Sequence, residues 1–259
     1  MDLQTVVDLV SYPLADDVFR AACRARLAED GVLVMQRFLR PAAIGAVREE
    51  GIANQHRAYF CRQLHNVYLR PSDPYFPADH PRNRQILSSK GCITDDVVPQ
   101  DSVLRTLYDS SLFKDYLCRV LGEKALHPYA DPLSSINIHY AKTGQELGWH
   151  FDNSSFAITL MIEPALAGGA FEYVTGVRNA DAGEMNYDAV ADVLDRKVTP
   201  KLLAMDAGAL VLFRGRNAMH RVTPVERERT RMLAVLAYNS EPGVSLSESA
   251  RMTFYGRLR

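Results

Sequence analysis

Apolar residues near the start of the chain recur at the spacing of an α-helix. In residues 16–28 they return every three or four positions, and the acidic pair Asp16 and Asp17 favours a helix start. Gly31 is typical of a helix end, and the apolar run over residues 32–35 predicts a short buried strand. The pattern therefore predicts a helix followed directly by a strand.

A second helix and a long proline-rich segment are expected next. Pro41 suits the first turn of a helix, which we expect to run to about residue 63. Residues 67–99 lack clear periodicity and are interrupted by prolines, so they predict a functional loop, such as a lid over a site. Helical spacing returns over residues 103–121, and the first half of the chain is therefore predicted to be mostly helical.

After Pro132 the pattern becomes that of β-strands. Residues 135–140 alternate between apolar and polar side chains, which is typical of a strand with one buried face. Further strand-like segments, separated by turns, are expected at 149–152, 156–162, 170–174, 209–213, 219–222 and 231–238. One helical insert is expected at residues 187–194. Many short strands at regular spacing predict an antiparallel sandwich or barrel.

These patterns predict an α+β fold in one domain over residues 1–259. Residues 1–130 would supply mostly helical support and the lid, and residues 131–259 would form the β-barrel core. Neither an internal repeat nor a low-complexity linker divides the sequence. The length suits one large domain or two small ones.

Composition and charge exclude several classes of protein. Apolar residues make up 47% and charged residues 24%, which excludes a disordered chain. The 30 basic and 31 acidic residues nearly cancel, so we expect no nucleic-acid partner and no membrane partner. The first 17 residues carry no basic stretch typical of a secretory signal. The four cysteines are widely separated and suit free thiols in the cytoplasm, which is the expected location.

Two histidines and one aspartate have the spacing of a metal site. His150 and Asp152 are two positions apart in a predicted strand, so their side chains point to the same side. His220 stands at the start of another predicted strand, after a turn that contains Gly215. Two histidines and one carboxylate on one face leave adjacent coordination positions open, as in the facial triad of non-haem Fe(II) oxygenases. The alternative is that each histidine is a hydrogen-bonded core residue.

Arg231 stands on an otherwise apolar strand face. Its neighbours on that face are Leu233, Val235 and Ala237. A guanidinium is costly to bury there unless it is paired with an acid. A bound dicarboxylate could pair with it through two parallel hydrogen bonds. A buried arginine–aspartate pair within the protein, or an arginine at the rim, is the alternative.

This set of four side chains resembles the Fe(II)/2-oxoglutarate-dependent oxygenases, which have a double-stranded β-helix core, a jelly-roll or cupin-like barrel. The segments that occur in the family's order are 148–152, 168–173, 212–217, 220–225 and 231–238. The resemblance covers about residues 131–238 and is nearest to the group that hydroxylates or halogenates free amino acids. Halogenases of that group replace the metal-binding carboxylate by a small residue so that halide can bind. Asp152 therefore favours hydroxylation.

The resemblance implies roles for individual residues. His150, Asp152 and His220 would hold Fe(II) and so carry the catalysis, and Arg231 would bind the distal carboxylate of the co-substrate 2-oxoglutarate. The family's chemistry implies O2 as the oxidant and succinate and CO2 as co-products. Iron does the difficult chemistry, and the protein supplies geometry, charge and exclusion of water.

Further contacts to cofactor and substrate are expected around this centre. Tyr140 could share the carboxylate of 2-oxoglutarate, with Asn137 as the rival candidate because strand alternation puts the two on opposite faces. Arg82 and Arg84 in the predicted lid could bind a substrate carboxylate, although solvated surface arginines are an equal alternative. Asn153 would reach the site only if the strand ends before it.

We therefore expect a 2-oxoglutarate-dependent dioxygenase that hydroxylates an unactivated C–H bond of a small polar molecule, such as a free amino acid or a derivative. One alternative is a β-barrel protein that binds metal or carboxylate without turnover. Another is the same oxygenase chemistry diverted to desaturation or cyclisation.

Overall fold

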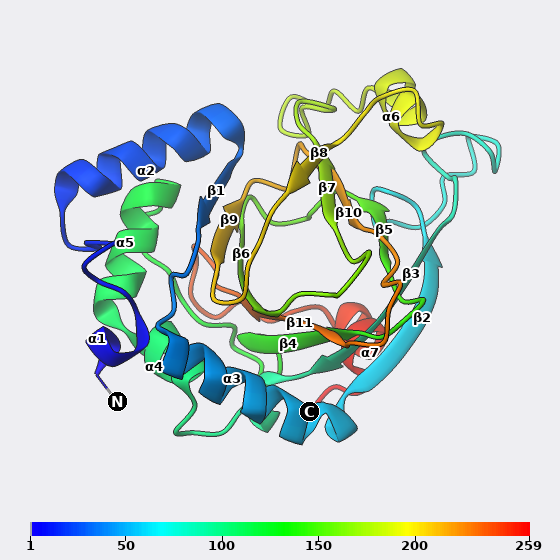
Figure 1. Ribbon diagram of the computed structural model, residues 1–259. Helices are drawn as coiled ribbons and strands as arrows, with labels where there is room; N and C mark the ends of the chain where they lie inside the picture. Colours follow the sequence, from blue (N-terminus) through cyan, green and yellow to red (C-terminus); the bar gives the residue numbers. More distant parts are fainter. Residues whose placement is uncertain (1) are drawn as a thin grey trace.

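The computed structural model describes residues 2–259, so Met1, the first residue of the predicted domain, lies outside the described residues. Two antiparallel sheets face each other (Figure 1). The larger sheet contains, in spatial order, β1 (Val32–Met35), β9 (Leu210–Phe213), β6 (Ala157–Glu163), β11 (Arg231–Leu236), β4 (Ile136–Ala141), β3 (Ile86–Ile93) and β2 (Tyr59–His65). The smaller sheet contains β5 (Leu147–His150), β10 (Met219–Val222), β7 (Phe171–Val174) and β8 (Lys201–Leu203). The predicted α+β fold with a jelly-roll core is confirmed.

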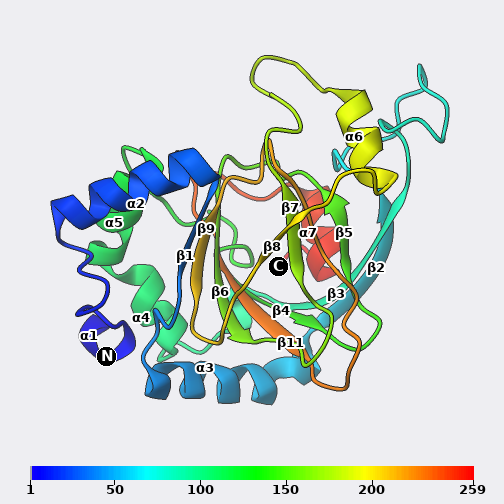
Figure 2. The same ribbon diagram turned by 45° about the horizontal axis from the view of Figure 1, so that its top comes forward.

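Helices of the first half cover the outer face of the larger sheet (Figures 1 and 2). They are α1 (Leu3–Val6), α2 (Asp17–Asp30), α3 (Pro41–Asn54), α4 (Val103–Asp109) and α5 (Ser111–Leu121). Strand alternation makes this packing possible, because Ile136, Ile138 and Tyr140 of β4 all point outward into the same apolar core as these helices.

Helix ends follow the predicted signals. The Asp16 carboxylate accepts a hydrogen bond of 2.7 Å from the Phe19 N–H and so caps α2, and Gly31 ends that helix in the left-handed conformation with φ 72°. The predicted helix over residues 103–121 is in fact two helices, because the Ser110 hydroxyl accepts from the Phe113 N–H and starts a new one.

Residues 55–99 differ most from the predictions. The helix that begins at Pro41 ends at Asn54, not near residue 63, and the one-turn helix η1 (Gln55–Arg57) leads into β2. β2 pairs along its length with β3, which lies inside the segment that was expected to be a loop and is followed by η2 (Asp95–Val97). Pairing between two strands far apart in sequence stabilises this structure, and local periodicity does not report it.

The outer face of the smaller sheet carries its own apolar cluster. Trp149 and Phe151, which alternate with His150, pack there against Val67 and Tyr68 of the loop that follows β2. The predicted helical insert is α6 (Tyr187–Leu194), which covers this cluster, while α7 (Glu248–Tyr255), near the end of the chain, packs on β2 and β3. Across residues 2–259, each helix falls short of the length and apolar character that a membrane crossing requires.

Gly148 allows β5 to lie close to β3, and its replacement is expected to destabilise the fold. An added Cβ would stand 2.3 Å from Ile86 Cγ2 and 2.4 Å from the Leu87 carbonyl oxygen. Overpacking of this kind costs about 1–3 kcal/mol, so Gly148→Ala should lower the urea midpoint of unfolding accordingly. Gly45→Ala is the matched control, because a Cβ on this helical glycine meets nothing within 4 Å. It should leave stability unchanged or raise it by up to about 1 kcal/mol. Equal midpoints for the two variants would contradict the close packing at Gly148.

Candidate active site

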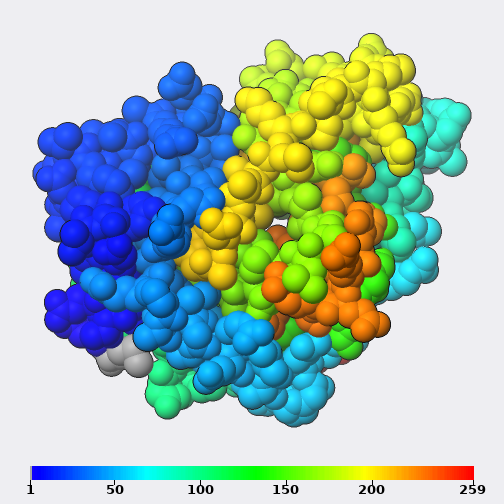
Figure 3. All heavy atoms as spheres, in the orientation of Figure 1, coloured from blue at the N-terminus to red at the C-terminus, as the bar shows by residue number. Residues whose placement is uncertain are grey.

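The two sheets enclose a cavity of about 330 Å³. Inward-facing side chains of both sheets line it, among them His139 of β4 and Leu233 of β11, together with Phe254 of α7. The face of the molecule shown in Figure 3 is hollowed between segments coloured green, yellow and orange. This is a volume suited to small molecules.

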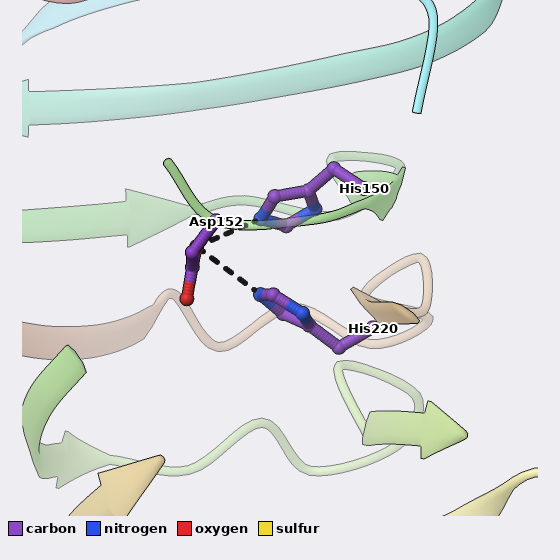
Figure 4. A group of neighbouring side chains, drawn as sticks. All are labelled: His150, Asp152 and His220. Carbon is purple, nitrogen blue, oxygen red and sulfur yellow. Dashed lines mark ion pairs between the residues drawn. The ribbon is translucent and has the colours of Figure 1, made fainter. Parts of the chain in front are cut away.

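The structure brings the predicted triad together inside this cavity. His150 is the last residue of β5 and His220 lies on β10, where the two are direct cross-strand partners with ring centroids 4.1 Å apart. Asp152 lies two residues beyond the end of β5, and its Oδ1 is 3.8 Å from His150 Nε2 and 3.4 Å from His220 Nε2 (Figure 4). One donor atom from each residue lies within 4.8 Å of the others, as metal ligands must.

Hydrogen bonds to the backbone orient both imidazoles. Nδ1 of His150 lies 2.8 Å from the Gly148 carbonyl oxygen, and Nδ1 of His220 lies 3.0 Å from the Ala218 carbonyl oxygen. Each Nδ1–H therefore donates to a carbonyl, which leaves each Nε2 lone pair directed toward Asp152. A second ring nitrogen fixed in this way is the usual support of a histidine that binds metal.

The charges of the triad suit a divalent cation. Burial, reinforced by the neighbouring His220, lowers the pKa of His150 to about 3, so its ring is neutral at physiological pH. Burial acts to raise the pKa of Asp152, but interaction with His220 and His150 outweighs it and holds the pKa below its usual value. The ionised carboxylate keeps one buried oxygen, Oδ2, without a hydrogen-bond partner. Two imidazole nitrogens and a carboxylate with a free oxygen fit Fe(II).

Gly215 makes room for the carboxylate of Asp152. An added Cβ at position 215 would stand 1.9 Å from Asp152 Oδ2 and 2.9 Å from His220 Cε1. The Gly215 carbonyl also accepts a hydrogen bond of 3.1 Å from the Asp152 N–H. In the sequence this glycine signals only a turn, so its part in shaping the site becomes clear only from the structure.

Arg231 is buried in the cavity wall without an acidic partner. Its side chain is on the predicted face with Leu233, and the residue is 4% exposed. Its Nε and Nη2 have no hydrogen-bond partner, and within residues 2–259 no carboxylate oxygen lies within 4.0 Å of it. Burial lowers its pKa to about 10, which leaves the guanidinium charged at neutral pH. The alternative of an internal arginine–aspartate pair is therefore wrong, and the free donors fit an incoming carboxylate.

Tyr140 requires a correction, because it does not reach the cavity. It points to the outer face of β4, where its hydroxyl donates a hydrogen bond of 2.7 Å to the Gly51 carbonyl. Asn137 does line the cavity, but its amide donates to the Leu133 carbonyl and its Oδ1 accepts from the Tyr255 hydroxyl. Since those groups are already bonded, Asn137 has little capacity left for 2-oxoglutarate.

The three expected substrate contacts also lie outside the cavity lining. Arg82 donates to the Pro71 carbonyl, 3.0 Å away, and lies over the Tyr68 ring. Arg84 forms an ion pair of 2.6 Å with Asp195, just after α6, so it ties the loop to that helix. The strand does end before Asn153, as its role required, but Asn153 is exposed. In this conformation none of the three contacts the site.

His65 and Lys90 are among the cavity residues that went unrecognised in the sequence. His65 of β2 accepts at Nε2 from the Ser88 hydroxyl, 2.6 Å away, and its ring centroid is 6.4 Å from that of His150. Lys90 of β3 points into the cavity toward His139. Both lie on the strand pair that was expected to be helix and loop. Cys61, Gln63 and His65 alternate along β2 and line the cavity, but they form no apolar face that would predict a strand from the sequence.

A known protein family matches most of the chain. The family model described as Halogenase D matches residues 16–253. A search of curated proteins returns no match. Among solved structures, the chain is similar to an oxidoreductase of the 2OG-Fe(II) oxygenase family from Burkholderia pseudomallei, with TM-score 0.54 and 13% identity over 87% of this chain and 93% of that one.

Two further structures share the fold. The non-haem alpha ketoglutarate dependent epimerase SnoN from nogalamycin biosynthesis has TM-score 0.58 and 10% identity over 86% of this chain and 83% of its own. A prolyl hydroxylase from Trichoplax adhaerens, in complex with a peptide fragment of hypoxia inducible factor, has TM-score 0.56 and 12% identity, with 85% and 89% covered. Identities this low establish the fold and leave the reaction open.

Proposed function

The chain belongs to the halogenase D family within the Fe(II)/2-oxoglutarate-dependent oxygenases, and from this premise we propose that it hydroxylates an unactivated C–H bond of a small polar substrate. A free amino acid or a derivative is the proposed substrate. One observation carries the choice of hydroxylation: Asp152 places a carboxylate at the third metal-ligand position, between two oriented imidazoles. A halide that binds iron needs that position.

Each residue then has a defined task. His150, Asp152 and His220 would hold Fe(II), and the buried donors of Arg231 would bind the distal carboxylate of 2-oxoglutarate. Iron and 2-oxoglutarate, when bound, supply the activation of O2 for attack on the C–H bond, with succinate and CO2 as co-products. The chain orients both cofactors and keeps the cavity largely apolar, which strengthens the charge interactions within it.

A screen of free amino acids tests the proposal. The protein is loaded with Fe(II) and 2-oxoglutarate in chloride-containing buffer and exposed to air, and succinate and product mass are measured together. We expect succinate with at least one amino acid, and a product heavier by one oxygen atom.

The other outcomes separate the rival functions. A product that gains chlorine overturns hydroxylation in favour of halogenation, and a product that loses two hydrogens indicates desaturation or cyclisation. Tight Fe(II) binding without succinate from any substrate favours a metal-binding protein without turnover.

A further inference from the structure

Lys90 and His139 form a second polar group in the cavity, apart from the metal triad. Nζ of Lys90 lies 3.3 Å from the ring nitrogens of His139 on the neighbouring strand and 5.2 Å from the centroid of the Phe254 ring. His139 is the cross-strand partner of Leu233, two positions along β11 from Arg231. The ammonium group therefore lies on the same inner sheet face as the guanidinium.

Lys90 has no acidic partner in the protein. Within the described residues 2–259, no carboxylate oxygen lies within 4.0 Å of its Nζ, and the only carboxylate that lines the cavity is Asp152. Burial, together with Lys90 and Arg231, holds the pKa of His139 well below its usual value, so this ring stays neutral. The cavity thus offers two basic side chains, Lys90 and Arg231, against one acid.

The charges of metal and co-substrate do not balance Lys90. Fe(II), Asp152, Arg231 and the dianion 2-oxoglutarate together carry no net charge. A protonated Lys90 leaves one positive charge unbalanced, and burial opposes that charge and lowers the pKa of Lys90. A substrate with one net negative charge removes this imbalance, whereas a cationic substrate increases it.

We propose that Lys90, with His139 beside it, binds a carboxylate of the primary substrate, and that the substrate is an acidic amino acid or a similar small organic acid. This inference rests on the proposed oxygenase function and names its substrate class. The ammonium group donates charge-assisted hydrogen bonds to the substrate carboxylate, while Arg231 remains committed to 2-oxoglutarate.

Binding of matched amino acids to the loaded protein tests this inference without turnover. The full chain is held with Fe(II) and 2-oxoglutarate in the absence of O2, and dissociation constants are measured by calorimetry. The probes are glutamate against glutamine and aspartate against asparagine, because each pair differs in charge and hardly in size. We expect at least one acid to bind about tenfold or more tightly than its amide, as loss of a charge-assisted hydrogen bond implies.

Variants at position 90 test whether Lys90 causes the preference for the acid over its amide. Lys90→Met should abolish the preference for the acid over the amide and leave 2-oxoglutarate affinity within about twofold, and Lys90→Arg should keep most of the preference. Lys142→Met is the matched control, since Lys142 lies over the Phe60 ring away from the cavity lining, and it should change neither affinity. Thermal unfolding of each variant confirms that it is folded.

Each contrary outcome has a distinct meaning. Acids that bind no better than their amides, or not at all, overturn the substrate class while succinate release in the screen still upholds the oxygenase. A Lys90→Met variant that loses 2-oxoglutarate affinity and keeps the acid preference reassigns Lys90 to the co-substrate. Failure of the parent protein to bind Fe(II) in a separate titration overturns the proposed function itself.

Discussion

Replacement of both His150 and His220 by alanine is expected to remove tight Fe(II) binding and, with it, all succinate formation. The two imidazoles supply two of the three donor atoms of the site, and Asp152 alone is left. Loss of even an outer partner of a metal ligand typically costs 10- to 100-fold in affinity, so loss of two ligands should exceed about a thousandfold. Anaerobic titration with Fe(II), followed by succinate measurement in air, checks both effects.

A histidine outside the cavity provides the control for this double variant. His56 is exposed beyond the end of α3, and its Nδ1 lies 2.8 Å from the Ala53 carbonyl oxygen. His56→Ala should therefore bind Fe(II) as the parent does and release succinate at the parental rate. If the double variant bound Fe(II) as tightly as the parent, the metal would lie elsewhere and the triad would have to be abandoned.

The metal triad could be predicted from sequence because the spacing of its residues is local. Alternation predicts that His150 and Asp152 point to one side, and both line the cavity although β5 ends at His150, while a turn before β10 precedes His220. The same rule puts Tyr140 and Asn137 on opposite faces of β4, and the structure follows it in both cases. Predictions that used alternation alone therefore match the geometry.

For a physical reason, the sequence did not predict that His65 and Lys90 line the cavity. His65 and Lys90 lie on β2 and β3, and these strands form because their backbones pair with each other and with β4. Several β2 side chains are partly exposed, so the strand has no continuous apolar face. Structure that depends on long-range pairing is not encoded in a local window. The cavity residues of β2 and β3 were missed for this reason, and the triad was not.

Arg231→Met is expected to weaken the binding of 2-oxoglutarate without lowering the stability of the fold. The guanidinium has buried donors without partners, so its removal should raise the 2-oxoglutarate concentration required for half-maximal succinate release. A buried charge pair that loses one partner costs about 2–5 kcal/mol, which corresponds to roughly 30- to several-thousandfold. Arg231→Lys keeps the charge but loses the paired geometry and should fall between parent and Met variant.

The same substitution should leave the fold intact or make it more stable. Without 2-oxoglutarate, Arg231 is a buried cation with no acid beside it, and replacement of such a charge by an apolar side chain of similar size is commonly neutral or stabilising. The thermal midpoint of the Met variant should therefore equal or exceed that of the parent when both lack 2-oxoglutarate. It should rise less than that of the parent when 2-oxoglutarate is added, because the ligand stabilises only a protein that binds it. Arg119→Met, on the exposed face of α5, should change neither property. An unchanged requirement for 2-oxoglutarate in the Arg231 variant would remove this arginine from the cofactor site.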